Sequence, residues 1–209
     1  MTFAEYLEFW KGLKTPEEKR RCLGWFSFDP NSEERQPIWN DDGELAPPFT
    51  PDLPVVGISG EAAEAYCAWL GKRLGLVCRL ATRLEWEKAA RGVDGRAYVW
   101  GNTYEPGRAL LRDNPRRGEF PVGAPPGRFP ADVSVYGVFD LTGNVREFIR
   151  SPGESEKLFM VIGGSYATDA QQANTAHVYY VNGSAGDLGF RYVLELPELR
   201  TETATPPLR

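Results

Sequence analysis

The sequence is poor in the residues that most enzymes use for metal or nucleophilic chemistry. Among its 209 residues it has one histidine, His177, and three cysteines, Cys22, Cys67 and Cys78. One histidine cannot form a three-histidine metal site, and neither H-E-x-x-H nor a phosphate-binding glycine loop occurs. The cysteines are odd in number and lack metal-ligand spacing, which predicts reduced and mostly buried thiols.

Long apolar runs and a stripe of basic charge are missing as well. No apolar stretch reaches the roughly 18 residues of a membrane span, and the N-terminal "MTFAEYLEFWKGL" carries acids where a signal peptide carries bases. The net charge of -5 argues against a nucleic-acid partner. The one basic cluster, residues 112–117, is interpreted as a solvated loop. We therefore expect a soluble, cytoplasmic protein without membrane insertion.

Helix-start signals concentrate in the first half of the chain. A threonine followed three residues later by glutamate forms a capping box, and a serine precedes a longer apolar pattern at helical spacing. These start signals are Thr2, Thr15, Ser59 and Thr82. Residues 24–54 are polar, proline-rich and aperiodic, which predicts a long connection with one short strand near residues 36–39.

Short apolar runs alternate with Gly, Pro, Asn and Asp turns after Gly92. This pattern is typical of short strands joined by structured loops. Helices followed by loop-rich strands predict an α+β fold. We expect a single domain over residues 1–196 and a C-terminal tail over residues 197–209.

Seven short motifs follow one another in a specific order. They are "PVVGISGEAAEAYCAWLGKRLG", "RLATRLEWEKAARG", "YVWGN", "PVGAPP", "YGVFDLTGNVREF", "GGSY" and "LGFR". In sequence and order they resemble the formylglycine-generating enzyme or sulfatase-modifying-factor family, over roughly residues 2 to 194. The resemblance implies a C-type lectin-like fold, with two main helices around a small twisted antiparallel sheet and much irregular loop.

The start of the chain, "MTFAEYLEF", is also similar to domains of this family that are appended to bacterial serine/threonine kinases. A regulatory or interaction module working with such a kinase is therefore one alternative function. A copper- or iron-dependent oxidase is another. The family's enzymes bind copper with two cysteines just after "GGS", and its sulfoxide synthases hold iron with a histidine cluster. This chain has neither set, so we expect no copper and no enzymatic activity.

The motif "DLTGNVREF" resembles a calcium site of the family. The resemblance assigns a side-chain oxygen, two backbone carbonyls and a carboxylate to Asp140, Gly143, Val145 and Glu147. Ca²⁺ prefers such oxygen donors, so a structural calcium ion is expected here. In the alternative interpretation, the two carboxylates satisfy turn amides and Asn144 adopts a left-handed conformation.

The stretch between "GGS" and "LGFR" differs most from the family, whose members usually place arginines there. No lysine or arginine lies between Gly164 and Arg191. Tyrosine, asparagine, aspartate and histidine occur there with alanine, threonine, serine and glycine. Tyrosine, asparagine, serine and glycine are typical of adaptable binding surfaces. The predicted ligand contacts are Tyr166, Thr168, Asp169, Asn174, His177, Tyr179, Tyr180, Asn182 and Ser184. The flanking glycines, Phe190 and Arg191 are interpreted as scaffold, with Phe190 in the core and Arg191 paired with an acid.

Nearly every residue from Ala167 to Asp187, except Gln171 and Gln172, can arise by replacing the adenines of an AAC or AAT codon. This pattern resembles the variable region of proteins diversified by retroelements, several of which use a lectin-like fold. The resulting hypothesis is a non-catalytic protein that displays residues 166–187 to a macromolecular ligand, most simply another protein. A family member whose loop has drifted without diversification is the alternative.

Overall fold

The computed structural model describes residues 1–27, 34–150 and 159–197, and apart from its first residue the expected tail over residues 197–209 lies outside them. Four α-helices occur in these ranges: α1 (Phe3–Lys11), α2 (Pro16–Arg21), α3 (Gly60–Leu74) and α4 (Arg83–Arg91), with a short 3-10 helix at Arg117–Glu119. Each α-helix begins after one of the four predicted cap residues, whose side chain accepts a backbone N–H bond. None of these helices is long and apolar enough to cross a membrane.

The strands form three small sheets. β1 (Trp25–Phe26) pairs with β2 (Gln36–Pro37), and β3 (Val77–Leu80) pairs with β8 (Tyr192–Glu195). The largest sheet has the order β6-β5-β4-β7, with β4 at Arg146–Ile149, β5 at Phe159–Ile162, β6 at Val178–Val181 and β7 at Leu188–Phe190. The predicted α+β class is confirmed, but the β4–β7 pair is parallel, which differs from the expected all-antiparallel sheet.

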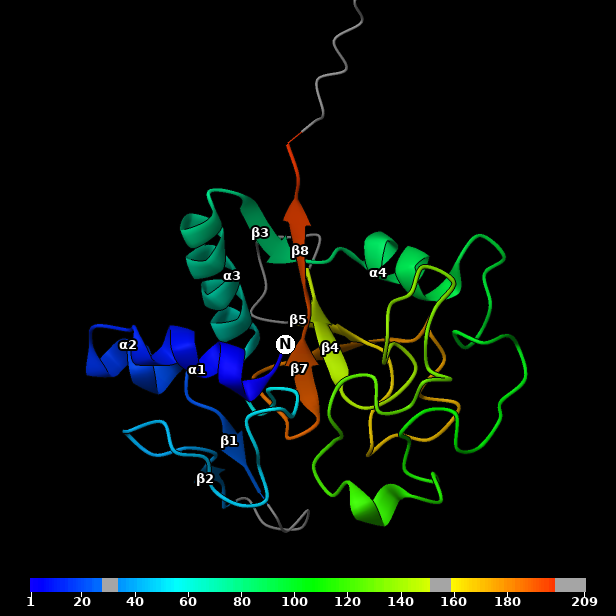
Figure 1. Cartoon of the computed structure of the whole chain (residues 1–209), viewed down its shortest axis with the longest axis horizontal. Helices are drawn as coiled ribbons and strands as arrows, with labels where there is room; N and C mark the ends of the chain where they lie inside the picture. Colours follow the sequence, from blue (N-terminus) through cyan, green and yellow to red (C-terminus); the bar gives the residue numbers. More distant parts are fainter. Residues whose placement is uncertain (28–33, 151–158, 198–209) are drawn as a thin grey trace, which may run out of the picture.

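Two hydrophobic cores cover opposite faces of the central sheet. On β4 and β5, Phe148 and Val161 contact the larger core, whereas Ile149, Met160 and Ile162 contact the smaller one. Successive side chains of a strand point to opposite faces, so both faces of these strands are dry. Figure 1 shows α1, α2 and α3 on one side of the molecule, and α4 with the long irregular segments on the other.

The larger core is rich in aromatic rings. Tyr6 of α1 stacks on Tyr66 of α3 with ring centroids 5.9 Å apart, and Phe190 of β7 lies edge-on to Tyr66 at 5.5 Å. Trp39 from the long connection is buried against Phe3 and Tyr6. Aromatic pairs at these distances add to the free energy of burial. The prediction that Phe190 enters the core is confirmed.

The three cysteines are free thiols, as predicted. Cys22 and Cys67 are buried, and Cys78 is half-buried at the start of β3. Burial raises the pKa of all three thiols. They therefore stay protonated at neutral pH and act as small core residues.

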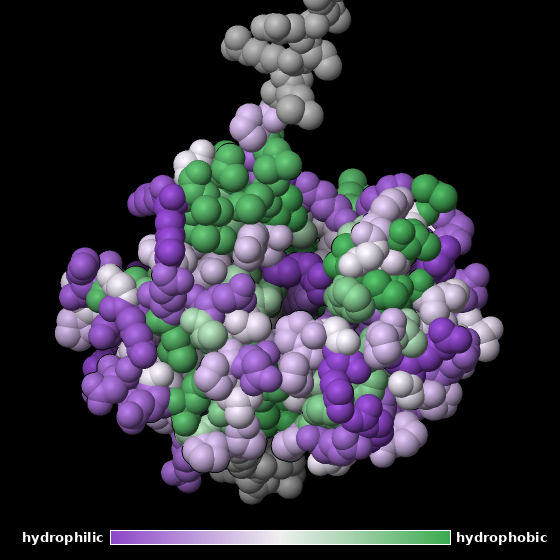
Figure 2. Space-filling view, viewed as in Figure 1, coloured by the Kyte–Doolittle hydropathy of each residue, from purple (hydrophilic) through white to green (hydrophobic). Residues whose placement is uncertain are grey.

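The surface mixes polar and apolar side chains. Figure 2 shows an apolar area at the position of α3 and β3 in Figure 1. Leu74 at the end of α3 and Val77 at the start of β3 are exposed hydrophobic residues there.

Candidate functional site

The segment between β5 and β7 is closed at its base by three side chains. Arg146 at the start of β4 donates two hydrogen bonds to the Asp187 carboxylate, at 2.8 and 2.7 Å. Ser165 Oγ donates a third to the same carboxylate at 2.6 Å. Ser165 precedes the predicted contact segment and Asp187 ends it. Both ends of residues 166–187 are therefore fixed to the central sheet.

The glycines before this base permit a close approach of backbone. A Cβ atom added to Gly164 would lie 2.3 Å from the Thr142 carbonyl oxygen and 2.6 Å from Ala173 Cβ. Gly163 has a φ of +84°, which favours glycine. The predicted scaffold role of these two glycines is confirmed.

The first half of the segment is held by its own hydrogen bonds. The Ser165 N–H donates to Thr168 Oγ1 at 2.7 Å, and the Gln172 N–H donates to the Asp169 carboxylate at 2.9 Å. Thr175 is fully buried, and both its N–H and its hydroxyl donate to the Ala97 carbonyl. These bonds give the loop a defined backbone without regular secondary structure.

Arg117 binds the start of the segment 166–187. Its Nε donates to the Tyr166 carbonyl at 2.8 Å, and its guanidinium lies 4.7 Å from the Tyr166 ring centroid. Two more of its bonds reach the carbonyls of Phe120 and Pro121. The interpretation of residues 112–117 as a solvated loop is therefore wrong for Arg117, which is partly buried.

Exposure divides the nine predicted contact residues into three groups. Tyr180 is 64% exposed, and His177 and Asn182 are also exposed. Asp169, Asn174, Tyr179 and Ser184 are half-buried. Tyr166 and Thr168 are buried, with 6% and 5% of their surface accessible.

The prediction that Tyr166 and Thr168 are displayed must therefore be corrected. The Tyr166 hydroxyl donates to the Gly186 carbonyl at 2.8 Å, so its ring bridges the two ends of the segment from inside. The Thr168 hydroxyl is used by Ser165 in the loop itself. Ala167 and Gln171 are exposed and were not among the predicted contacts. The hydrogen bonds within the loop decide which of these side chains face the solvent, and the sequence gives no direct signal of those bonds.

The half-buried Tyr179 links strand β6 to the base formed by Arg146, Asp187 and Ser165. The Arg146 guanidinium lies 5.9 Å from its ring centroid, and the ring of the exposed His177 lies 5.5 Å away. Arg146 thus contacts both Asp187 and Tyr179. The basic residue in "GNVREF" was the only sequence signal for this role of Arg146. Its partners Asp187 and Tyr179 are far away in sequence, so they could not be inferred from it.

Three of the four predicted calcium ligands, Asp140, Val145 and Glu147, line a small cavity of about 200 Å³ together with Arg191, whereas Gly143 does not line it. The Arg191 guanidinium donates to both Glu147 oxygens at 2.6 Å, and Trp86 Nε1 donates to one of them at 2.7 Å. The prediction that Arg191 pairs with an acid is confirmed. A calcium ion bound by Glu147 would have to displace Arg191.

Asp140 and its neighbours satisfy the loop backbone. The Asp140 carboxylate accepts the Gly127 N–H at 2.7 Å, and the Gly143 N–H donates to Asp132 at 2.9 Å. Asn144 has a φ of 74°, as the alternative interpretation expected. Burial raises the pKa of Asp132 to about 7 and that of Asp140 to about 6. In this arrangement both oxygens of Glu147, the expected carboxylate ligand, are paired with Arg191, and the calcium site stays a prediction.

Comparison with known proteins now places these features in a family. Residues 12–196 match the model of the sulfatase-modifying factor enzyme 1-like domain. The chain belongs to this family. It is 36% identical over 160 residues to the inactive C-alpha-formylglycine-generating enzyme 2 of Bos taurus, which covers 67% of this chain and 50% of that protein. It is 35% identical over 143 residues to the formylglycine-generating enzyme of Mycobacterium tuberculosis, covering 64% of this chain and 44% of the enzyme.

Among solved structures, the fold is similar to Treponema denticola variable protein 1. The TM-score is 0.59 at 20% sequence identity, and the match covers 74% of this chain and 76% of that chain. This likeness supports the C-type lectin-like fold expected for the sulfatase-modifying factor family. The chain spans about half the length of the curated relatives it matches.

Within the sulfatase-modifying factor framework, the segment after "GGS" contains no thiol. The described cysteines lie elsewhere, on α3, on β3 and directly after α2. Across residues 1–27, 34–150 and 159–197, no group of three His, Cys, Asp or Glu side chains is arranged to hold a metal ion. Directly after "GGS", where the resemblance places the copper-binding cysteines of the family's enzymes, this chain has the buried Tyr166 and Thr168 with their hydrogen bonds.

Proposed function

We propose that this member of the sulfatase-modifying factor family is a non-catalytic ligand-binding protein. We call residues 166–187 the display segment. The binding surface consists of the exposed side chains of this segment. The observation that carries the proposal is the fixed base formed by Arg146, Asp187 and Ser165. A loop held at both ends can present exposed side chains with little entropy to lose on binding.

The chemistry of the exposed residues supports a macromolecular ligand, most simply a protein. Tyr180 buries a large area with only two side-chain torsions to fix, and Asn182 and His177 supply adaptable hydrogen bonds. These side chains project from β6 and its flanking turns, and β6 pairs with the buried strand β5. A surface of this type depends on shape and hydrogen bonding, and the segment contains no cation that would attract nucleic acid.

The absence of cysteine after "GGS" supports a role without catalysis. The resemblance places two copper-binding cysteines of the family's enzymes directly after "GGS", and in this chain no cysteine follows Cys78. The similarity to a relative named as inactive points the same way. We expect purified protein treated with copper to retain no stoichiometric metal and to consume no oxygen with a cysteine-containing peptide. Tightly bound copper together with oxygen consumption would contradict the proposal.

The finer proposal is that a retroelement diversifies the display segment. The codon pattern of residues 167–187 and the fold shared with a protein named as variable support it. We expect the genome to carry, beside a reverse-transcriptase gene, a near-copy of this gene's 3′ end that differs only at adenines. Sequencing the neighbouring DNA tests this. If no such copy exists, the diversification proposal fails, while the binding role remains testable by itself.

A further inference from the structure

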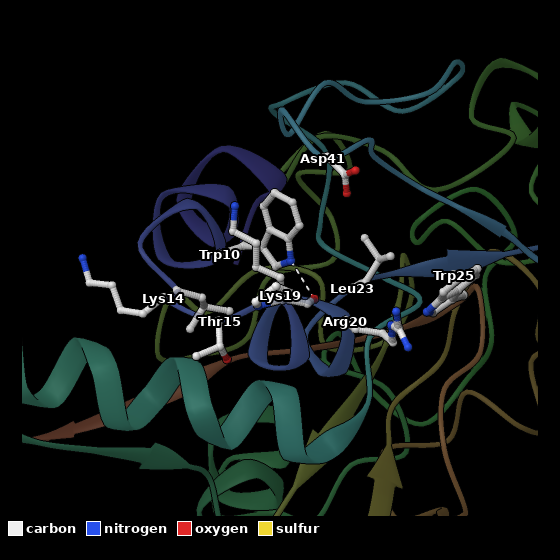
Figure 3. Close-up of a pocket in the computed structure, with 10 residues that line it drawn as sticks. Trp10, Lys14, Thr15, Lys19, Arg20, Leu23, Trp25 and Asp41 are labelled. Atoms are coloured by element: carbon white, nitrogen blue, oxygen red, sulfur yellow. Dashed lines mark hydrogen bonds between the residues drawn. The ribbon is translucent and has the colours of Figure 1, made fainter.

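A second concave site lies far in sequence from the display segment, at the corner between α1 and α2. Its cavity volume is about 760 Å³, within the range of small-molecule sites. Figure 3 shows the residues that line it. They are Trp10, Leu13, Lys14, Thr15, Pro16, Lys19, Arg20, Leu23, Trp25 and Asp41.

Two indole rings and two leucines form the apolar part of this corner pocket. Trp10 is held in place because its Nε1 donates to the Lys19 carbonyl at 2.9 Å, which ties α1 to α2. Trp25 is half-buried on β1, and its backbone N–H donates to Gly57 at 3.0 Å. Among the described residues, the Trp25 indole N–H has no hydrogen-bond acceptor. The pocket is therefore preformed and still offers an indole donor.

The charged residues of the corner pocket are mainly cations. The Lys19 ammonium lies 4.7 Å from the Trp10 ring centroid, and Arg20 lies on the side of Trp25. Within the part of the chain that the structure describes, neither cation is in an ion pair with a carboxylate. Asp41 is the one acid of the lining, and Figure 3 places it across from them. Lys14 extends away from the other labelled side chains.

We propose that the corner pocket binds a small organic anion with a flat aromatic body. Trp25, Leu13 and Leu23 would cover the aromatic part over a floor formed by Trp10, which is only 2% exposed. Lys19 and Arg20 would bind the anionic group. Charge-assisted hydrogen bonds of this kind are the stronger ones in binding sites. The lining shares no residue with the display segment, so the two proposals can fail separately.

The probe for this proposal is 8-anilino-1-naphthalenesulfonate, which combines an aromatic body with one sulfonate. We expect one saturable site on the full chain, monitored by fluorescence titration. A Lys19→Gln, Arg20→Gln double variant should weaken binding at least about tenfold, because two charge-assisted bonds are lost. Lys14→Gln removes the same charge from the same corner and should change the dissociation constant less than about twofold.

Two further measurements locate the probe and test its charge. The indole N–H signal of Trp25, assigned with a Trp25→Phe variant, should shift in ¹H–¹⁵N spectra when the probe is added. In the Lys19→Gln, Arg20→Gln variant the same signal should not shift. The uncharged N-phenyl-1-naphthylamine should bind at least about tenfold more weakly. Unsaturable binding, equal binding by the folded double variant, or an unmoved Trp25 signal would overturn the proposal.

Discussion

Replacing Glu147 by alanine is expected to destabilise the domain by about 3 to 5 kcal/mol, because it leaves buried partners of the carboxylate unpaired. Glu147 is only 4% exposed. Its two oxygens accept both hydrogen bonds from Arg191 and one from Trp86 Nε1. The variant therefore leaves the Trp86 indole N–H without its acceptor. It also leaves the Arg191 guanidinium, whose side chain is 27% exposed, with only the carbonyl oxygens of Phe139 and Asp140 as acceptors. The free energy of unfolding, measured by urea denaturation, checks this value.

A matched control separates this effect from the loss of any ion pair. Glu119 also pairs with an arginine, Arg116, but both side chains are well exposed, at 56% and 42%. Glu119→Ala should change the unfolding free energy by less than about 1 kcal/mol. Equal effects of Glu119→Ala and Glu147→Ala would contradict the role of the Glu147–Arg191 pair. Such a result would also reopen Glu147 as a free calcium ligand.

Replacing Asp187 by alanine is expected to cost about 3 kcal/mol and to loosen the display segment. Arg146 and Asp187 are 19% and 9% exposed, so their pair is largely shielded from water. The variant also removes the acceptor of the fully buried Ser165 hydroxyl. Hydrogen exchange should accelerate in residues 166–187 more than in α3. Urea denaturation gives the accompanying loss of stability.

Asp169 in the same segment provides the comparison. Its pair with Arg112 is exposed, with side chains 48% and 62% accessible. Asp169→Ala removes this exposed pair and the acceptor of the Gln172 N–H, so it should cost about 1 kcal/mol and affect hydrogen exchange near Gln172, while exchange at the two ends of the segment stays unchanged. If Asp187→Ala left the exchange of the segment at the wild-type rate, the base would not be what holds the display segment.

Local signals predicted the helices well, because each depends on residues close in sequence. Thr2, Thr15 and Thr82 each cap a helix with the expected reciprocal bond to glutamate. The apolar pattern at helical spacing after Ser59 likewise corresponds to α3. The scaffold roles of Gly164 and Phe190 followed from their sequence context and are confirmed by close packing.

Long-range partners could not be predicted in the same way. The parallel pairing of β4 and β7 joins strands separated by the whole display segment, and no periodicity records it. Tyr166 and Thr168 have the composition of contact residues, yet Gly186 and Ser165 take up their hydroxyls. Arg117 was interpreted as part of a solvated loop. Its hydrogen-bond acceptors are backbone carbonyls, which cannot be recognised in the sequence.

The central claim is that residues 166–187 form a display surface on a fixed scaffold. Two libraries on the full chain test it most directly, one randomised at the exposed Ala167, His177, Tyr180 and Asn182, the other at the buried Tyr166, Thr168, Ala173 and Thr175. The measured quantity is the fraction of clones that resist proteolysis and, among them, the fraction that can be selected to bind an arbitrary protein. We expect most clones of the exposed library to stay folded and to yield binders, and most clones of the buried library to be degraded. Equal intolerance in both libraries, or no binder from the exposed one, would contradict the account.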